Sequence, residues 1–202
     1  MANVSRITDR LLTGGDLPLD IGPNGMLLDL RDLEAEGVTH IIDNRSEWSD
    51  EPFVARYAPG IRYLHNGQDD SGQRMPDDWF ARGVGFALEA LQAPGTTVLA
   101  HCHMGVNRGP SMAFAVLLAQ GVEPVAALDA IVSARPIVGL AYAADALDWW
   151  HRRSRTPAPV AARQRAEFAD WLTVHPLGIL RAPRPSPSPS PSPSTSASRG
   201  LH

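Results

Sequence analysis

Short apolar runs alternate with longer amphipathic stretches along the first 150 residues of the chain. Four runs have the length of buried strands, at residues 10–13, 38–42, 61–64 and 96–100. Elsewhere apolar side chains recur every three or four residues, which predicts helices from residue 24 or 25 to 36, and over 75–93, 110–120, 124–134 and 142–153. This alternation predicts an α/β fold with a mostly parallel sheet of four or five strands flanked by helices.

The stretch from Val98 to Ser111 is where we expect the chemistry. An apolar run ends at Cys102, the only cysteine of the chain, and a helical pattern resumes from Pro110. Proline is tolerated in the first turn of a helix, and Gly121 has the position of a helix end. A buried strand therefore delivers Cys102 at its carboxyl end, directly before a tight loop and a helix.

The loop between Cys102 and Arg108 is predicted to bind a tetrahedral anion. A loop that curls over a helix start points backbone N–H groups inward, and the free amides and positive dipole end of the helix add to them. Gly105 and Gly109 supply the conformational freedom that such a curl needs. The guanidinium of Arg108 matches phosphate geometry and stays charged, and this environment favours the thiolate form of Cys102. The predicted phosphate-binding residues are His103, Met104, Gly105, Val106, Asn107 and Arg108.

The sequence His101-Cys102-x5-Arg108 resembles the signature loop of the cysteine-based protein tyrosine phosphatases. The small size of the chain is similar to that of proteins in the dual-specificity branch of this family. Residues 6–15, 37–43 and 126–136 resemble other segments of that branch, so the resemblance covers about residues 4–153. It implies a phosphatase-like fold and a hydrolase of phosphate monoesters. In such an enzyme Cys102 is the nucleophile, a phosphocysteine is the intermediate, and no cofactor is required.

Family membership also implies a general acid on a mobile loop before the cysteine. Asp70 is the predicted acid, because it lies 32 residues before Cys102 and ten before Phe80, and Asp69 is the second choice. The departing oxygen needs a proton, which a neutral carboxyl group can supply. An ordinary solvated loop that carries two acids is the alternative interpretation.

His101, Asn107 and Ser111 are assigned supporting roles. By the resemblance, His101 is expected to hold the loop backbone through hydrogen bonds rather than to transfer protons. Asn107 and Ser111 either bond to the loop or only begin the helix. His101, Cys102 and His103 are metal-ligating residue types, but adjacent side chains diverge on a strand and no second Cys/His cluster exists, so we expect no metal. A structural buried thiol is the alternative for Cys102.

Asp43 and Arg45 are candidates for the border of the cleft. They follow the predicted strand over residues 38–42, and open α/β sheets bind ligands beyond the carboxyl ends of their strands. A loop ion pair is an equally ordinary interpretation. Trp48, Phe53 and Tyr57 are interpreted as packing residues or cleft wall in a following loop.

Gly109 departs from the dual-specificity pattern. In that branch the residue after the arginine is usually serine or threonine, whose hydroxyl assists the departing thiolate when phosphocysteine is hydrolysed. Glycine cannot do so, and Ser111, one turn further on, is the candidate replacement. The departure leaves open a phosphate-binding pseudophosphatase or interaction module with impaired turnover. A sulfur-transfer or arsenate-reducing enzyme is a more distant possibility.

The composition sets limits on class and location. The chain has 202 residues, of which 44% are hydrophobic and 20% charged, and this suffices for one core. No apolar run reaches membrane-spanning length, and residues 1–10 have no signal-peptide core, so a cytoplasmic location is expected. All 18 basic residues are arginine, which with the abundant alanine and proline suggests a GC-rich bacterial genome.

Charge divides the chain into an acidic domain and a basic tail. Residues 1–150 have a net charge of −10 and residues 151–202 one of +6. We predict a catalytic domain over 1–153, an arginine-rich linker with a helix over 154–182, and a disordered Pro/Ser-rich tail over 183–202. The helix, residues 161–174, is expected to dock on the core; membrane or partner binding is the alternative.

The acidic domain also bears on the substrate. A domain with this charge and no lysine is a poor match for nucleic acid and for highly phosphorylated inositol lipids. A phosphoprotein is the predicted substrate, with phosphotyrosine first and phosphoserine or phosphothreonine second. A small phosphorylated metabolite remains an alternative. No membrane partner is predicted, and the sequence does not indicate an oligomeric state.

Overall fold

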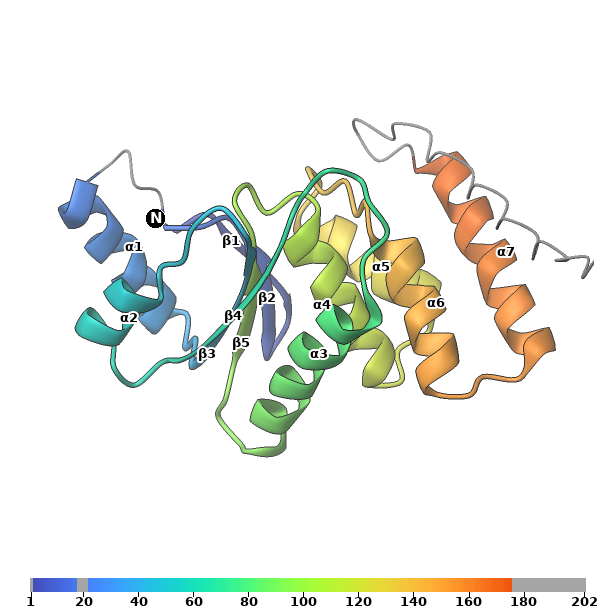
Figure 1. The fold of residues 1–202 in the computed structure, drawn as a ribbon, viewed down its shortest axis with the longest axis horizontal. Coiled ribbons are helices and arrows are strands. Elements are labelled where there is room, and N and C mark those ends of the chain that lie inside the picture. Colours follow the sequence, from blue (N-terminus) through green and yellow to red (C-terminus); the bar gives the residue numbers. More distant parts are fainter. Residues whose placement is uncertain (1, 18–21, 176–202) are drawn as a thin grey trace, which may run out of the picture.

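A computed structural model describes residues 2–17 and 22–175 of the chain. They form a five-stranded sheet with helices on both faces, which confirms the predicted α/β class (Figure 1). The predicted Pro/Ser-rich tail, residues 183–202, lies outside the described residues.

The sheet is parallel apart from one edge strand. Its order is β1-β2-β5-β3-β4, and only β1 and β2 pair antiparallel. The edge strand β1 is half exposed and was not predicted as a separate strand, because its alternating polar residues resemble an ordinary exposed segment. The strands are β1 Val4–Thr8, β2 Leu11–Gly14, β3 His40–Arg45, β4 Arg62–Gln68 and β5 Val98–His101.

Seven helices are found in the described part of the chain. The six helices that the apolar periodicity predicts are all present, with ends that differ by a few residues. A short seventh helix, α2, replaces part of the predicted loop after residue 45; it buries only Val54, so the pattern carried no helical signal. The helices are α1 Gly22–Ala35, α2 Glu51–Tyr57, α3 Asp77–Gln92, α4 Arg108–Ala119, α5 Pro124–Ala134, α6 Ala143–Arg153 and α7 Ala158–Val174.

The core has two parts, one on each face of the sheet. Successive side chains of a strand point to opposite faces, so Val98 and Ala100 of β5 join the larger cluster with α3 to α6. Leu99 joins the smaller cluster with α1 and α2. Each such buried side chain contributes about 1.5–3 kcal/mol to stability. The sheet is therefore packed on both faces by helices, and it holds the loops that follow its strands in place.

Strand β3 is longer than predicted. The prediction ended it at residue 42 because three polar residues follow, but the strand continues through Asp43, Asn44 and Arg45, all of which are fully buried. Its pairing with β4 continues to Arg45, and Asp43 still pairs with His101 of β5. Charged residues are accommodated here because Asp43 and Arg45 neutralise each other. Of the two interpretations of these residues, the cleft border is wrong because both side chains are fully buried, and the ion pair is confirmed, at 2.8 Å.

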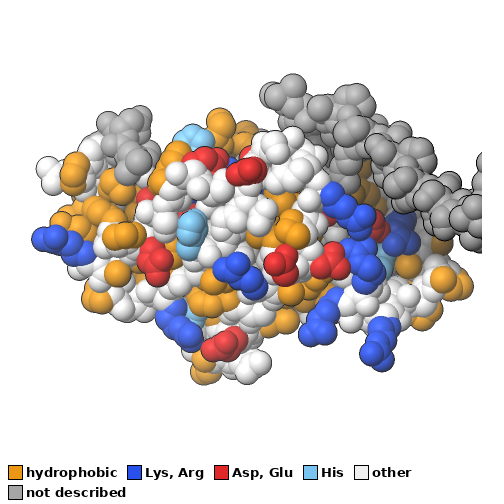
Figure 2. Space-filling view, in the orientation of Figure 1, with side chains coloured by type: hydrophobic (Ala, Val, Ile, Leu, Met, Phe, Trp, Pro, Cys, Tyr) orange, Lys and Arg blue, Asp and Glu red, His pale blue; other side chains and the backbone are white. Residues whose placement is uncertain are grey.

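Helix α7 docks on the core, as predicted. Phe168 and Trp171 are buried, and the indole N–H of Trp171 donates a hydrogen bond to Asp129 of α5 at 2.6 Å. On the face drawn in Figure 2, arginine side chains gather on the side of α6 and α7. Within residues 2–17 and 22–175, no helix is both long and apolar enough to cross a membrane.

Candidate active site

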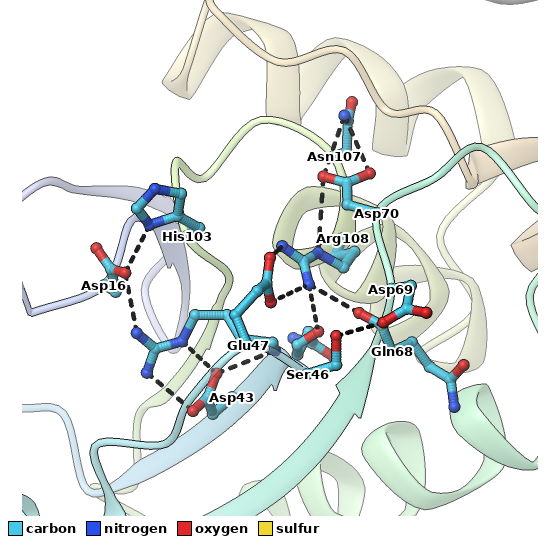
Figure 3. A network of polar contacts seen from close by, with 12 residues as sticks. Asp16, Asp43, Ser46, Glu47, Gln68, Asp69, Asp70, His103, Asn107 and Arg108 are labelled. Atoms are coloured by element: carbon cyan, nitrogen blue, oxygen red, sulfur yellow. Dashed lines mark hydrogen bonds and ion pairs between the residues drawn. The ribbon is translucent and has the colours of Figure 1, made fainter.

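The site lies at the carboxyl edge of the sheet. Because β3, β4 and β5 run parallel, the segments that follow them meet at one edge, where open α/β sheets bind ligands. Residues 46–50, 69–76 and 102–107 come together there, and Figure 3 shows their polar contacts. The loop 102–107 joins β5 to α4, with Cys102 at its start and Arg108 at its end.

The carbonyl groups of the loop 102–107 are turned outward. The four carbonyl oxygens of residues 103–106 accept hydrogen bonds from the backbone N–H groups of Asp16 and Gly139 and from the guanidinium of Arg135, at 2.7–3.2 Å. A carbonyl and the N–H of the next residue point in opposite directions in a planar peptide. The N–H groups of residues 104–107 therefore point to the inner side. No acceptor within the described residues receives them, so they form a cradle for an anion.

Gly105 is required by this curl. Its φ angle is +67°, a conformation that L-residues rarely adopt, and an added Cβ would collide with the backbone of Gly14. The loop also packs directly against Arg135, which is buried. Burial lowers the pKa of Arg135. The described hydrogen-bond partners of its guanidinium are neutral carbonyl, amide and hydroxyl oxygens, so none of them offsets the effect of burial with a negative charge. Sequence reasoning missed this residue.

The Arg108 guanidinium is buried and only partly satisfied. Nη1 donates to Glu47 Oε2 at 2.8 Å and to the carbonyl oxygen of Gln68 at 2.7 Å, and Nη2 donates to Glu47 Oε1 at 2.8 Å. The Nε–H makes no hydrogen bond to any described residue, and the second N–H of Nη2 is also unassigned. Arg108 thus presents one edge, Nε and Nη2, with two free donors, which is the arrangement that binds two oxygens of a phosphate.

Glu47 was missed by sequence reasoning and lies on the other edge of Arg108 (Figure 3). The bidentate hydrogen bonds from Arg108 lower the pKa of Glu47 to about 2, although burial works in the other direction. Burial also works to lower the pKa of Arg108, but the Glu47 hydrogen bond and the charges of Cys102, Glu47 and Asp70 raise it. The pair therefore stays ionised at any working pH and fixes the plane of the guanidinium.

The two candidate acids occupy different places. Asp70 lies over Arg108, with its Oδ2 at 3.6 Å from Nε, and accepts hydrogen bonds from Asn107 at 3.3 and 3.4 Å and from the Tyr142 hydroxyl at 2.7 Å. Asp69 instead accepts a hydrogen bond from Ser46 at 2.6 Å. The position of Asp70 beside Arg108 suits a proton donor, whereas the carboxylate of Asp69 is turned to the segment that follows β3.

A second arginine, Arg45, lies beneath the loop in a cluster of carboxylates. It contacts Asp43, Asp16 and Asp50 at 2.7–2.9 Å. Burial works to raise the pKa of Asp43, but the hydrogen bonds from Arg45 outweigh it and the pKa falls below its ordinary value. We call this set, completed by Tyr63, whose hydroxyl donates to Asp43 at 2.7 Å, the Arg45 cluster.

The two histidines of the loop lie in different surroundings. The His101 ring is buried, with Nε2 at 3.7 Å from Asp43 Oδ1, and it makes no hydrogen bond to the loop backbone among the described residues. The side-chain N–H of Asn44 donates a hydrogen bond at 2.9 Å to the carbonyl oxygen of His101, the residue directly before the loop. His103 is half exposed and contacts Asp16 at 2.8 Å. Within the described residues, no group of His, Cys, Asp or Glu side chains is arranged to hold a metal ion.

Gly109 and Ser111 follow the loop in the first turn of α4. A Cβ at Gly109 would lie 2.9 Å from the carbonyl oxygen of Ala100 and 3.0 Å from backbone atoms of His101, so a larger residue is crowded there. The Ser111 hydroxyl accepts a hydrogen bond from the backbone N–H of Tyr142 at 3.2 Å. Its proton is left for another acceptor, so its predicted part in thiolate departure remains a prediction.

Known proteins with similar sequences are phosphatases. No family model matches the chain. The rat and human proteins named dual specificity protein phosphatase 26 are each 33% identical to it over 101 residues, which are 50% of this chain and 47% of theirs. The match thus spans about half the length of these curated relatives. They are mammalian, so a bacterial origin of this chain stays a prediction.

Solved structures with a similar fold are also phosphatases. PTPMT1 in complex with PI(5)P superimposes with a TM-score of 0.59 and 22% identity, over 77% of this chain and 99% of that one. Human DUSP28 gives 0.60 and 16%, over 76% and 97%. The fold is therefore that of the cysteine-based phosphatases. Within that class the sequence similarity is to the dual-specificity protein phosphatases, which confirms the resemblance seen in the sequence.

Proposed function

We propose that this protein is a cysteine-dependent phosphatase that hydrolyses phosphate monoesters through a phosphocysteine intermediate. One observation supports this most: four inward amides, those of residues 104–107, and the free Nε/Nη2 edge of Arg108 belong to the loop that starts at Cys102. These donors match the equatorial oxygens of a phosphoryl group. Such preorganised donors stabilise the charge of a transition state in a site from which water is excluded.

In the first step, the Cys102 thiolate attacks phosphorus in line with the leaving oxygen. The S–P bond forms as the P–O bond breaks, and the electron pair of that bond stays on the leaving oxygen. Asp70, protonated before the reaction, delivers its proton to this oxygen so that it departs as an alcohol or phenol. Arg108 and the loop amides hold the phosphoryl group throughout, and Glu47 holds Arg108.

In the second step, water attacks the phosphocysteine. Asp70, now ionised, accepts a proton from the water as the O–P bond forms, and the S–P bond breaks to restore the thiolate. Phosphate then leaves the cradle, and both residues have returned to their starting forms. Cys102, Asp70, Arg108 and the loop amides carry out the whole cycle by nucleophilic attack, positioning, proton transfer and charge stabilisation.

Phosphotyrosine in proteins is the substrate class that we favour, with phosphoserine and phosphothreonine second. Similarity to proteins named dual specificity protein phosphatases supports this choice. PTPMT1, whose structure contains PI(5)P, has a similar fold, but the acidic domain of this chain, without any lysine, is less suited to a highly charged lipid headgroup. A panel of phosphopeptides and PI(5)P, at equal phosphate concentration, would rank these classes.

The test of the activity is turnover of p-nitrophenyl phosphate and a phosphotyrosine peptide without added metal. We expect wild type to release phosphate continuously, and Cys102→Ser to release none while it still binds vanadate. Asp70→Asn should retain vanadate binding and lose turnover of the phosphotyrosine peptide, whose leaving oxygen is basic, about 10²-fold or more. Equal activity of wild type and Cys102→Ser would contradict the proposal.

The absence of a hydroxyl at Gly109 favours one second candidate, a pseudophosphatase that binds phosphorylated proteins. In that case Cys102 still attacks but the phosphocysteine persists, or no attack occurs. Time-resolved release of p-nitrophenol separates the two functions. A burst of one equivalent followed by almost no release indicates a stalled second step, no release indicates a binding module, and steady release indicates the phosphatase.

A further inference from the structure

Tyr142 connects the loop that carries Asp70 with α4, the helix that follows the loop 102–107, which we call the phosphate loop. Its side chain is fully buried at the start of α6, and its hydroxyl donates a hydrogen bond to Asp70 Oδ1 at 2.7 Å. The same hydroxyl accepts the backbone N–H of Gly72 at 3.2 Å, so it holds the acid loop at two points. The backbone N–H of Tyr142 donates to Ser111 in the first turns of α4. Tyr142 therefore ties the acid loop to the helix that follows the phosphate loop.

The direction of the hydrogen bond between Tyr142 and Asp70 is fixed. Because Gly72 can only donate, it occupies the acceptor side of the Tyr142 oxygen, and the phenolic proton is directed to Asp70. Burial, assisted by the neighbouring Asp70, raises the pKa of Tyr142 above its ordinary value. The phenol therefore stays protonated through the working pH range and acts as a constant donor.

This fixed donor makes the two oxygens of Asp70 unequal. Oδ1 receives the short hydrogen bond from Tyr142, whereas Oδ2 lies on the side of Arg108, 3.6 Å from its Nε; Asn107 Nδ2 contacts both oxygens, at 3.3 and 3.4 Å. Oδ1 is engaged by a donor that does not reverse, so a proton taken up by Asp70 is placed on Oδ2. Figure 3 shows Asp70 between Asn107 and Arg108.

We propose that Tyr142 is a positioning residue that aims the Oδ2 proton of Asp70 at the leaving oxygen of the substrate. The proposal rests on the proposed phosphatase function and adds to it the residue that makes Asp70 effective as an acid. Tyr142 itself touches neither the phosphate nor the nucleophile in this scheme. It acts only in the step that needs a proton.

This role predicts a dependence on the leaving group. A basic leaving oxygen needs the proton, whereas a weakly basic one departs with little help. Phenyl phosphate releases phenol, whose pKa resembles the value of about 10 for a tyrosine side chain. p-Nitrophenyl phosphate releases a much more acidic phenol. If the Asp70 proton is no longer directed at the leaving oxygen, hydrolysis of phenyl phosphate therefore slows much more than hydrolysis of p-nitrophenyl phosphate.

The experiment compares kcat/KM of wild type and Tyr142→Phe on both esters. We expect a decrease of about 10-fold with phenyl phosphate, the size of one hydrogen bond to a charged group, and less than about 2-fold with p-nitrophenyl phosphate. The inhibition constant of inorganic phosphate should be the same for both proteins. In an Asp70→Ala background, Tyr142→Phe should change neither rate, because Tyr142 acts through Asp70.

Tyr63→Phe is the matched control. Tyr63 is also a buried phenol that donates to a carboxylate at 2.7 Å, but its partner is Asp43 in the Arg45 cluster. Any effect of Tyr63→Phe on rate should be the same for the two esters. An equal effect of Tyr142→Phe on both esters, or none on phenyl phosphate, would overturn the positioning role while the enzyme remains a phosphatase. A wild-type protein that hydrolyses neither ester would instead overturn both this inference and the proposed function.

Discussion

Arg45 and Arg108 lie close to the same edge of the sheet, and both side chains are almost completely buried, at 0% and 2% exposure. In Arg45, Asp43 occupies the Nε/Nη2 edge through Nε–Oδ1 and Nη2–Oδ2 contacts, and Asp16 and Asp50 take further N–H groups. In Arg108, Glu47 occupies the opposite edge; Nε makes no hydrogen bond to any described residue, and the Asp70 carboxylate lies 3.6 Å from it.

Burial alone does not distinguish an arginine that only stabilises the fold from one that can bind a ligand. The number and direction of unused N–H groups do so. The Nε/Nη2 edge of Arg45 is bonded to Asp43, whereas Nε on the same edge of Arg108 makes no hydrogen bond to any described residue. Arg45 therefore stabilises the carboxyl end of β3 and, through Asp16, the loop 102–107. Arg108 is held by Glu47 and keeps two donors unused, which we propose bind a phosphate. Four predictions test this division between the two arginines and the residues around them.

The largest contrast is expected between Arg108→Lys and Arg45→Lys. Lysine keeps the charge but lacks the two-pronged geometry. Arg108→Lys should lower kcat/KM for p-nitrophenyl phosphate about 10²–10³-fold, because two transition-state donors are lost. Arg45→Lys should instead lower the free energy of unfolding by about 3–5 kcal/mol, because a single ammonium group cannot replace the hydrogen bonds that the guanidinium donates to three buried carboxylates. Enzyme kinetics and urea unfolding of both variants measure these effects.

The reverse result would contradict the division between the two arginines. It would consist of an Arg45→Lys protein of normal stability with little activity, or an Arg108→Lys protein that turns over normally. Arg56→Lys is a control, because this residue is exposed on α2 and should change neither quantity.

Gly109→Ser tests whether the hydroxyl of the dual-specificity pattern can be restored. The added Cβ meets backbone atoms of Ala100 and His101 at 2.9–3.0 Å, and backbone at the end of β5 cannot move easily. We expect the free energy of unfolding to decrease by about 1–3 kcal/mol and turnover not to increase. Gly109→Ala is the matched variant without the hydroxyl. A serine variant of normal stability that is faster than both wild type and the alanine variant would show that Gly109 limits hydrolysis.

Glu47→Gln tests whether Glu47 orients Arg108 or competes with phosphate for it. If Glu47 holds only the Nη1/Nη2 edge, its loss lets the guanidinium turn, and the inhibition constant of inorganic phosphate should rise about 5-fold. Glutamine keeps the size of the side chain but not the charge. Tighter phosphate binding in the variant would mean that Glu47 occupies the substrate position, and the free edge of Arg108 would lose its significance.

The last prediction concerns the pH dependence of stability that His101 contributes. Burial lowers the pKa of His101; the charge of Arg45 acts in the same direction, and those of Asp43, Asp50 and Asp16 oppose it. The folded protein therefore resists a proton that the unfolded chain accepts below about pH 6.5. The free energy of unfolding should fall as the pH decreases from about 7.5 to 5.5, by at most about 1.4 kcal/mol per pH unit for this group.

Urea unfolding of wild type and His101→Asn over this pH range measures the contribution of His101. The variant should have the shallower slope, because other groups such as His40 contribute equally to both proteins. Glu47 does not interfere, since its lowered pKa of about 2 makes its contribution fully present above pH 4.5 and lost only below it. Identical slopes would mean that His101 is not held neutral in the fold.

Local sequence patterns were sufficient to predict the central part of the site. The strand, cysteine, loop and helix from Val98 to Ser111 are contiguous, so periodicity and the His-Cys-x5-Arg spacing predicted β5, the loop and the beginning of α4 to within two residues. Asp70 followed from its spacing to the cysteine. The ion pair of Asp43 and Arg45 was one of two interpretations of the sequence, but the continuation of β3 through both residues was missed because polar residues after an apolar run are typical of a loop.

The supporting residues could not be predicted in this way. Glu47 is 61 residues from Arg108, Tyr142 is 72 from Asp70, and Arg135 is 30 from Gly105. Each of these contacts is created by the packing of α2, α5 or α6 near the carboxyl edge of the sheet rather than by a local pattern. Nothing in the immediate sequence of Glu47, Arg135 or Tyr142 distinguishes it from an ordinary loop or helix-end residue.

The most direct test of the central claim is to locate the phosphate during the reaction. The protein is mixed with p-nitrophenyl phosphate, denatured within milliseconds, and digested for mass spectrometry. The proposed function predicts up to one phosphoryl group per protein on the peptide that contains Cys102, and none in Cys102→Ser. Steady hydrolysis by wild type and Cys102→Ser alike, with no phosphate on this peptide, would contradict it.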